Sequence, residues 1–236
     1  AYTYSPNDCS VGDVDGDGEY EIIVKWDPSN SKDNSEKGAY TGNVYIDGYK
    51  TDGTKLWRID LGRNIRAGAH YTQFMVYDLD GDGKAEVACK TAPGTIDGQG
   101  KAVLMGDDKV TDDYRVSSGS NMGIIVSGPE YLTVFNGQTG AEITTVSYVP
   151  LRSVRSNSQW GDSYGNRSER YLACVAYLDG QKPSLVMCRG YYTASYLCAW
   201  DFDGKNLTQR WLHKSETAGE GIYGEGAHAL TVGDVD

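Results

Sequence analysis

The chain has few of the features that membrane, redox and nucleic-acid-binding proteins depend on. No apolar run approaches the ~20 residues that a membrane-spanning helix needs. Lys and Arg number 22 against 33 Asp and Glu, a formal net charge of −11, and no basic stripe or tail is present. We therefore expect no membrane partner and no nucleic-acid partner. The five cysteines are odd in number and form no C-x-x-C pair, which argues against a thiolate metal site.

Helical periodicity and phenylalanine are also scarce. The chain has 3 Phe against 18 Tyr and 30 Gly, which is typical of a turn-rich β protein with tyrosine on wet surfaces. Cys89 and Cys188 follow the same motif inside apolar strands. We expect both to be buried core residues. A Cys174–Cys188 or Cys188–Cys198 bridge stays open, and we do not predict one.

An acidic motif recurs and organises the chain. It runs from Asp13 to Glu21 and again from Asp78 to Glu86, each time before an apolar run. A worn copy begins at Tyr177 and lacks three of the carboxylates, and another begins at Asp234. Carboxylates at alternate positions, with glycines that permit a tight turn, supply the hard oxygen ligands that calcium requires. An EF-hand is excluded, because β-type sequence flanks both loops and no glutamate stands at loop position twelve.

The motif predicts several calcium ions. In the first loop the expected ligands are Asp13, Asp15, Asp17, Glu21 and the Glu19 carbonyl. In the second they are Asp78, Asp80, Asp82, Glu86 and the Lys84 carbonyl, and the last copy contributes Asp234 and Asp236. The third copy is expected to bind calcium poorly or not at all.

Four predicted strands follow one another in each repeat, which indicates β-propeller blades. The predicted blades span residues 8–61, 70–149 and 170–213, and another starts over 226–236. The fold class is therefore all-β, with residues 1–236 forming part of a single β-propeller domain. Because propellers close with about four to eight blades, we expect the chain to be an excerpt of a longer protein.

Lys25, Lys90 and Arg189 each end the strand that leaves an acidic loop. They could ring a channel mouth and attract an acidic polymer. Equally, each could form an ion pair with a nearby carboxylate. Tyr191 and Trp160 lie in polar loops as candidate sugar contacts, and His70 and Arg66 are candidates for catalysis.

Six segments resemble the family 11 polysaccharide lyases, the bacterial rhamnogalacturonan lyases. They are 4–8, 25–34, 64–77, 127–132, 160–167 and 189–193. The resemblance implies an eight-bladed propeller with structural calcium, of which this chain would be the N-terminal half. It implies endolytic β-elimination in the rhamnogalacturonan I backbone of pectin, by a secreted, extracellular bacterial protein that we expect to be monomeric.

The resemblance also implies site residues. It places Asn7 and Asp27 at the substrate cleft and Asp8 on a calcium ion, and it places proton transfer in later blades. Ala194 and Ala229 depart from the pattern of the family, which leaves substrate contacts near Ala194 open. Two alternatives remain: a non-catalytic calcium propeller that binds carbohydrate or a protein, and an inactive fragment of a lyase.

Overall fold

Strands make up nearly all the regular structure of the computed structural model, which describes residues 2–234. The first sheet contains β1 (Tyr4–Gly12), β2 (Glu21–Pro28), β3 (Tyr45–Tyr49) and β4 (Lys55–Asp60). The second contains β5 (Phe74–Tyr77), β6 (Glu86–Thr91), β7 (Tyr131–Asn136) and β8 (Glu142–Ser147). The third contains β9 (Ala173–Ala176), β10 (Ser184–Arg189), β11 (Ser195–Phe202) and β12 (Leu207–Ser215). One 3-10 turn (Arg152–Val154) and α1 (Asn157–Trp160) are the helical pieces of the described chain.

Each sheet is a four-stranded antiparallel meander, so the predicted all-β fold class is confirmed. The sequence pattern predicts strands over 55–60 and 86–91, and β4 and β6 have these limits in the structure. No strand forms over the described residues 226–234, where the sequence predicts the start of another unit. Leu230 packs instead against the apolar residues of the third sheet.

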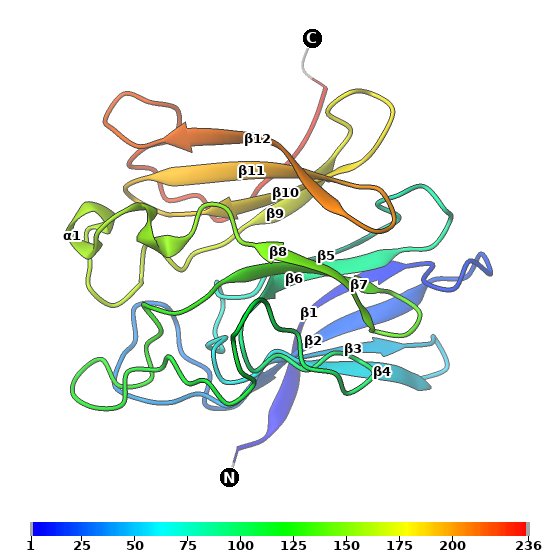
Figure 1. Ribbon diagram of the computed structural model, residues 1–236, viewed down its shortest axis with the longest axis horizontal. Helices are drawn as coiled ribbons and strands as arrows, with labels where there is room; N and C mark the ends of the chain where they lie inside the picture. The colour runs from blue at the N-terminus through cyan, green and yellow to red at the C-terminus, as the bar shows by residue number, and fades with distance from the viewer. Residues whose placement is uncertain (1, 235–236) are drawn as a thin grey trace.

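The three sheets stack on one another, with the second between the other two (Figure 1). Side chains alternate along β6 and β7, because successive residues of a strand point to opposite faces. Val87 and Phe135 join the core shared with the first sheet, whereas Ala88 and Val134 join the core shared with the third. Trp57 of the first sheet donates a hydrogen bond from Nε1 to the Gly137 carbonyl at 2.7 Å. The second sheet is therefore buried on both faces.

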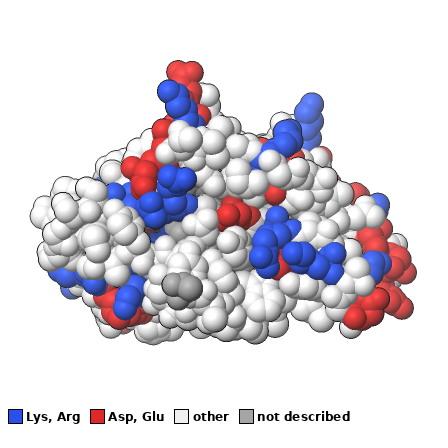
Figure 2. Space-filling view, turned by 90° about the horizontal axis from the view of Figure 1, so that it is seen from below, with Lys and Arg blue, Asp and Glu red and all other residues white. Residues whose placement is uncertain are grey.

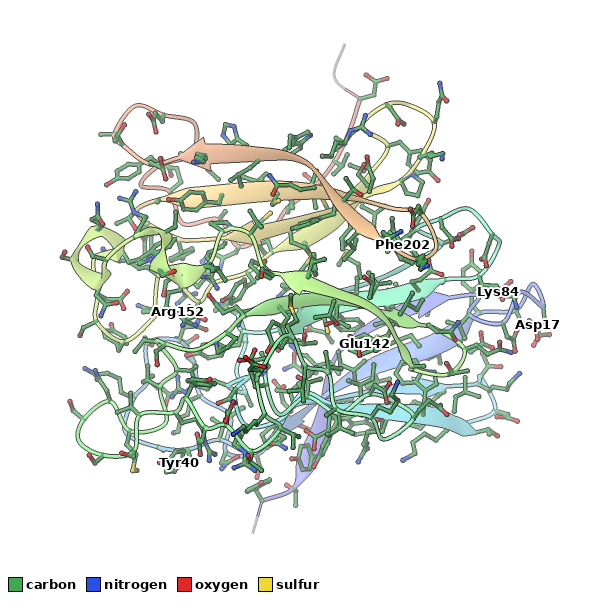
Figure 3. The ribbon with its side chains drawn as sticks, in the orientation of Figure 1. Asp17, Tyr40, Lys84, Glu142, Arg152 and Phe202 are labelled. Atoms are coloured by element: carbon green, nitrogen blue, oxygen red, sulfur yellow. The ribbon has the colours of Figure 1, made fainter. Side chains whose placement is uncertain are left out.

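The connections separate into two ends of the molecule. The loops that join the first and second strand of each sheet carry the acidic motifs, and they lie at the right of Figure 1. The long connections β2–β3, β6–β7 and β8–β9 extend toward the left, where Figure 3 labels Arg152 far from Asp17 and Lys84. No helix of the described residues is long and apolar enough to span a membrane.

All five cysteines have free thiols in the structure. Cys89 and Cys188 are buried among apolar neighbours, and burial raises the pKa of each thiol to about 12. A thiol with so high a pKa is a poor nucleophile, which suits a packing residue.

Candidate functional site

The first acidic loop is held in shape by Asp13. Its carboxylate accepts hydrogen bonds from the amides of Gly16 at 2.6 Å and Gly18 at 2.9 Å. Both glycines have φ above 80°, a backbone conformation that residues with a Cβ rarely adopt. The turn brings carboxylate oxygens of Asp13, Asp15 and Asp17 within 4.8 Å of one another. A hard divalent cation could be held there.

The second loop repeats this turn and adds a buried carboxylate. Oxygens of Asp78, Asp80 and Glu86 lie within 4.8 Å of one another. Burial, together with the charges of the neighbouring aspartates, raises the pKa of Glu86 to about 8. Asp82 and Glu21 lie outside these close groups, and Glu21 accepts a hydrogen bond from the Val14 amide at 3.0 Å instead. Figure 2 shows acidic side chains gathered at the edge of the molecule where Figure 3 labels Asp17.

In the worn third loop the remaining acidic group, Asp179, is paired with an arginine of β12. Arg210 Nη1 lies 3.3 Å from Asp179 and 3.0 Å from Asp201. A guanidinium of the protein thus neutralises the charge that a metal ion would otherwise neutralise. In the last copy, Asp234 lies within the described residues, whereas the predicted ligand Asp236 lies outside them.

A bulge interrupts the pairing of β1 with β2 at two residues that the resemblance assigns to the site. The register shifts between Pro6, which pairs with Trp26, and Cys9, which pairs with Val24. Asn7 and Asp8 of β1 therefore lie opposite one residue of β2, Lys25. Such bulges turn side chains out of a sheet and are frequent near active sites. Asp8 Oδ2 lies 2.5 Å from Nζ of Lys25, which is fully buried.

Asp27 lies two residues further along β2, on the same face as Lys25. Burial raises the pKa of its carboxyl, with Lys25 acting in the opposite direction. Its Oδ1 is buried and has no hydrogen-bond partner among the described residues. Buried carboxylate oxygens are nearly always paired, so this oxygen is a ready acceptor for a ligand hydroxyl.

Lys90 and Arg189, which are equivalent to Lys25 in the repeats, form ion pairs with nearby carboxylates. This was the alternative to a ring of cations at a channel mouth. Lys90 is 6% exposed and Arg189 is 1% exposed, so neither lines an open channel mouth. Lys90 Nζ lies 3.4 Å from Glu130 Oε1, and Arg189 also binds Glu130. Glu130 precedes β7 and Arg189 ends β10, so the ion pair joins two sheets.

A second group of polar side chains lies close enough to Lys25 for its charge to act on His70. His70 Nε2 is 3.9 Å from Asp33, and Arg170 is 3.8 Å from that same carboxylate. The Tyr191 hydroxyl and His228 Nε2 are 2.8 Å apart. Burial lowers the pKa of His70, and Arg170 and Lys25 lower it further while Asp33 raises it. The imidazole is therefore neutral near pH 7 and able to accept a proton.

Two sequence-predicted site residues lie in the interior instead. Trp160 is 1% exposed, with Nε1 donating to the Arg152 carbonyl at 3.0 Å and its ring edge-on to Tyr196. The buried indole cannot contact a sugar directly in this structure, contrary to the prediction from the sequence. Arg66 is also buried and donates to the Tyr71 hydroxyl at 2.5 Å and to the Glu36 carbonyl at 2.8 Å. Through these two hydrogen bonds Arg66 holds the segments around Tyr71 and Glu36 together.

Sequence reasoning missed Asp33 and His228 as members of this group, and it left Arg170 open between a contact with a polyanion and a solvated loop. Asp33 stands inside one of the matching segments, which was a usable signal. Arg170 reads as one of several arginines in a solvated loop, and His228 lies beyond the last predicted complete blade. Their proximity depends on how three separate loops fold over one end of the sheets.

Tyr192 is the one non-glycine residue of the described chain with a left-handed backbone, at φ 59°. Its ring is half exposed and stands edge-on to Tyr191, with centroids 4.0 Å apart. We expect Tyr192→Asn to leave the free energy of unfolding within about 1 kcal/mol, because asparagine tolerates this conformation. Tyr192→Val should lower it by about 1–2 kcal/mol, because β-branched residues do not. Urea denaturation measures both free energies of unfolding. Equal stability of the two variants would contradict the prediction that the left-handed backbone at position 192 disfavours a β-branched residue.

A family model described as "Rhamnogalacturonan lyase family 11, C-terminal domain" matches residues 1–236. The rhamnogalacturonan exolyase YesX of Bacillus subtilis (strain 168) is 62% identical over 236 residues, which are 100% of this chain and 37% of that protein. The rhamnogalacturonan endolyase YesW of the same organism is 60% identical over 237 residues, covering 100% of this chain and 36% of that protein. The chain thus spans little more than a third of the relatives that it matches.

Solved structures agree with these relationships. The crystal structure of the exotype lyase YesX superposes with a TM-score of 0.92 at 61% identity, covering 100% of this chain and 37% of that one. The rhamnogalacturonan lyase PL11 of Bacillus licheniformis gives a TM-score of 0.91 at 62% identity, covering 100% and 38%. On the match of the whole chain to the family model and on these identities, the chain belongs to rhamnogalacturonan lyase family 11.

Proposed function

We propose that this chain is part of a lyase that cleaves the rhamnogalacturonan I backbone of pectin, between rhamnose and galacturonate, by β-elimination. The observation that carries the proposal is the bulge at Asn7 and Asp8 beside Lys25, with Asp27 offering an unpaired buried oxygen. Membership of the family and identities of 60% and 62% to two named lyases support it. Endolytic action stays a prediction, since one of these relatives is an exolyase and the other an endolyase.

The same proposal includes the architecture and the setting of the whole protein. Three stacked four-stranded meanders whose first strands are neighbours suit successive blades of an eight-bladed propeller. Secretion is proposed from the substrate, because pectin is an extracellular polymer, and the monomeric state stays an expectation.

Calcium is the metal that the two acidic loops suit best. Each supplies three carboxylates within 4.8 Å, on a turn shaped by glycine. Hard oxygen ligands on a flexible loop favour calcium over transition metals. Binding there is proposed to be structural, because both loops lie at the end of the sheets opposite Arg152 and the long connections (Figure 3).

β-Elimination at galacturonate needs three things: neutralisation of the sugar carboxylate, removal of the proton beside it, and departure of the 4-linked oxygen. The resemblance implies a calcium ion at Asp8, which would supply the first as a Lewis acid, whereas in this structure the ammonium of Lys25 pairs with that carboxylate. Asn7 and Asp27 are proposed to bind and orient sugar hydroxyls, since the β1 bulge at Asn7 lies opposite the stretch of β2 that leads to Asp27. His70 is neutral near pH 7 and stays a candidate proton acceptor. The family resemblance places proton transfer in the later blades.

Asp27→Asn tests the site. We expect kcat/KM on rhamnogalacturonan to fall about 10- to 100-fold, the value of losing one charge-assisted hydrogen bond of roughly 1.5–3 kcal/mol. The measurement is the rise in ultraviolet absorbance from the unsaturated uronate product, made on a protein of the length of its relatives. The fold should tolerate the change, because burial already disfavours the charged form of Asp27.

Asp113→Asn is the matched control, because Asp113 pairs with Arg115 on the surface, away from the bulge. It should keep wild-type kcat/KM. Full activity of Asp27→Asn would remove Asp27 from the site. Binding of the polymer without any unsaturated product from the wild-type protein would support a non-catalytic carbohydrate-binding propeller and overturn the lyase proposal.

A further inference from the structure

Lys50 distinguishes the first acidic loop from the second. It follows β3 of the first sheet, and its Nζ lies 3.3 Å from Oδ2 of Asp15. The ammonium is also close enough to Asp17 and Glu21 for its charge to interact with theirs. All three carboxylates are predicted calcium ligands. A cation of the protein therefore lies beside the groups that a metal ion would use.

The backbone of the hairpin between β3 and β4 fixes the position of Lys50. Its amide donates a hydrogen bond to the Thr54 carbonyl, and its carbonyl accepts one from the Gly53 amide, both at 2.9 Å. Tyr49 pairs with Ile22, so Lys50 follows at the end of the ladder, where β2 begins. The side chain is 41% exposed, so its ammonium can turn away from the loop into solvent. The fold thus holds the cation within reach of the loop without locking it there.

The second sheet has a neutral residue at the equivalent position. Glu86 begins β6 as Glu21 begins β2, and it pairs with Asn136. The side-chain oxygen of Asn136 accepts from the amide and from the hydroxyl of Thr139, both at 2.9 Å. No Lys or Arg of the described residues forms an ion pair with a carboxylate of the second loop. The neighbouring charges that act on Glu86 are those of aspartates.

The third loop pairs a cation with the equivalent aspartate. Asp179 precedes a glycine as Asp15 does, at the second acidic position of the motif, and Arg210 lies 3.3 Å from it. This loop has lost three carboxylates of the motif. The three loops therefore form a series. The second has no paired cation, the first has a half-exposed ammonium, and the third has a guanidinium and too few ligands for calcium.

We propose that Lys50 competes with calcium at the first loop, so that the second loop fills at a lower calcium concentration than the first. Calcium must displace the ammonium from Asp15 and then stay close to its positive charge, and both effects weaken binding. The inference rests on the proposed function in one respect, that the acidic loops hold calcium. β1 leads from the bulge at Asn7 and Asp8 into the first loop. The weaker site thus lies at the end of the strand that carries candidate site residues.

Calorimetric titration with calcium tests this, on metal-free protein of the length of its relatives. Asp17→Asn and Asp80→Asn identify the heat of each loop, because each removes one predicted ligand from one loop. The heat lost in Asp17→Asn should report a Kd at least about fivefold weaker than the heat lost in Asp80→Asn. Lys50→Asn, which copies the second sheet, should tighten binding at the first loop about five- to tenfold and leave the second loop unchanged.

Two further variants separate the ion pair from charge in general. Lys55→Asn removes a cation of the same hairpin that forms no ion pair among the described residues, so it should leave both Kd values unchanged. Lys50→Arg keeps a cation at the loop and should keep the first site weak. High ionic strength should narrow the difference between wild type and Lys50→Asn, because salt screens exposed charges.

The outcomes separate this proposal from the one on which it rests. Equal Kd values for the two loops, or an unchanged first loop in Lys50→Asn, would overturn the competition by Lys50 while leaving calcium binding intact. An equal gain of affinity in Lys55→Asn would also overturn it, because the effect would then be general electrostatics. No calcium binding at either loop would overturn the proposed calcium sites themselves.

Discussion

Glu130→Ala is expected to lower the free energy of unfolding by about 3–5 kcal/mol, the cost of leaving buried charges unpaired. Glu130 accepts from the Arg152 amide at 2.7 Å and from Arg152 Nη2 at 3.2 Å, and it also binds Arg189 and Lys90. Burial alone would raise the pKa of Glu130, but the three cations hold it well below its ordinary value. Without Glu130, only Glu169 would remain to balance three buried cations.

The surface pair Asp113–Arg115 gives a matched control for this variant. Its atoms are as close as 2.5 Å, but the side chains are 37% and 23% exposed. Exposed pairs contribute about 0–1 kcal/mol, so Asp113→Ala should scarcely change stability. Urea denaturation monitored by tryptophan fluorescence measures both. If Glu130→Ala costs no more than Asp113→Ala, the buried ion pairs do not hold the second and third sheets together.

Removal of calcium is expected to have the second large effect. A site filled at about 100 times its Kd stabilises the folded protein by about 2.7 kcal/mol, so two such loops would contribute about 5 kcal/mol. Thermal unfolding in excess calcium and in excess chelator measures the difference. A midpoint unchanged by chelation would overturn the proposal that the acidic loops hold calcium.

The effect of Glu86→Gln on stability should have opposite signs in excess chelator and in excess calcium. In chelator the variant should be at least as stable as the wild type, because burial and the neighbouring aspartates already disfavour the ionised form. In calcium it should be less stable, because a carboxylate ligand is gone. Asp179→Asn, in the loop that Arg210 neutralises, should change the response to calcium in neither direction.

The sequence predicted the strands and the acidic turns well because both depend on local pattern. The apolar run after the acidic motif predicts β2, and the glycines of the motif predict the turn around Asp13. The environment of Lys90 and Arg189 could not be predicted in the same way. Equivalent positions in a repeat share a place in their sheets, but Glu130 and Glu169 reach them from long irregular connections.

The burial of Trp160 and the bulge in β1 could not be predicted from the sequence, for related reasons. Trp160 follows Ser156, whose side chain and that of Gln159 cap the short α1 reciprocally, and this turn directs the indole inward. A polar loop sequence does not reveal that direction. The bulge at Asn7 and Asp8 leaves no mark on the alternation of β1, so only the family resemblance drew attention to these residues.

The position of the second sheet has a consequence for how the chain unfolds. Its strands β6 and β7 supply side chains to both apolar clusters, so no step can remove that sheet and leave either cluster whole. The outer sheets each share only one of these two clusters with it. Amide hydrogen exchange should therefore be slowest in β6 and β7, where opening requires global unfolding. It should be faster in the outer strands β4 and β12, which can open locally.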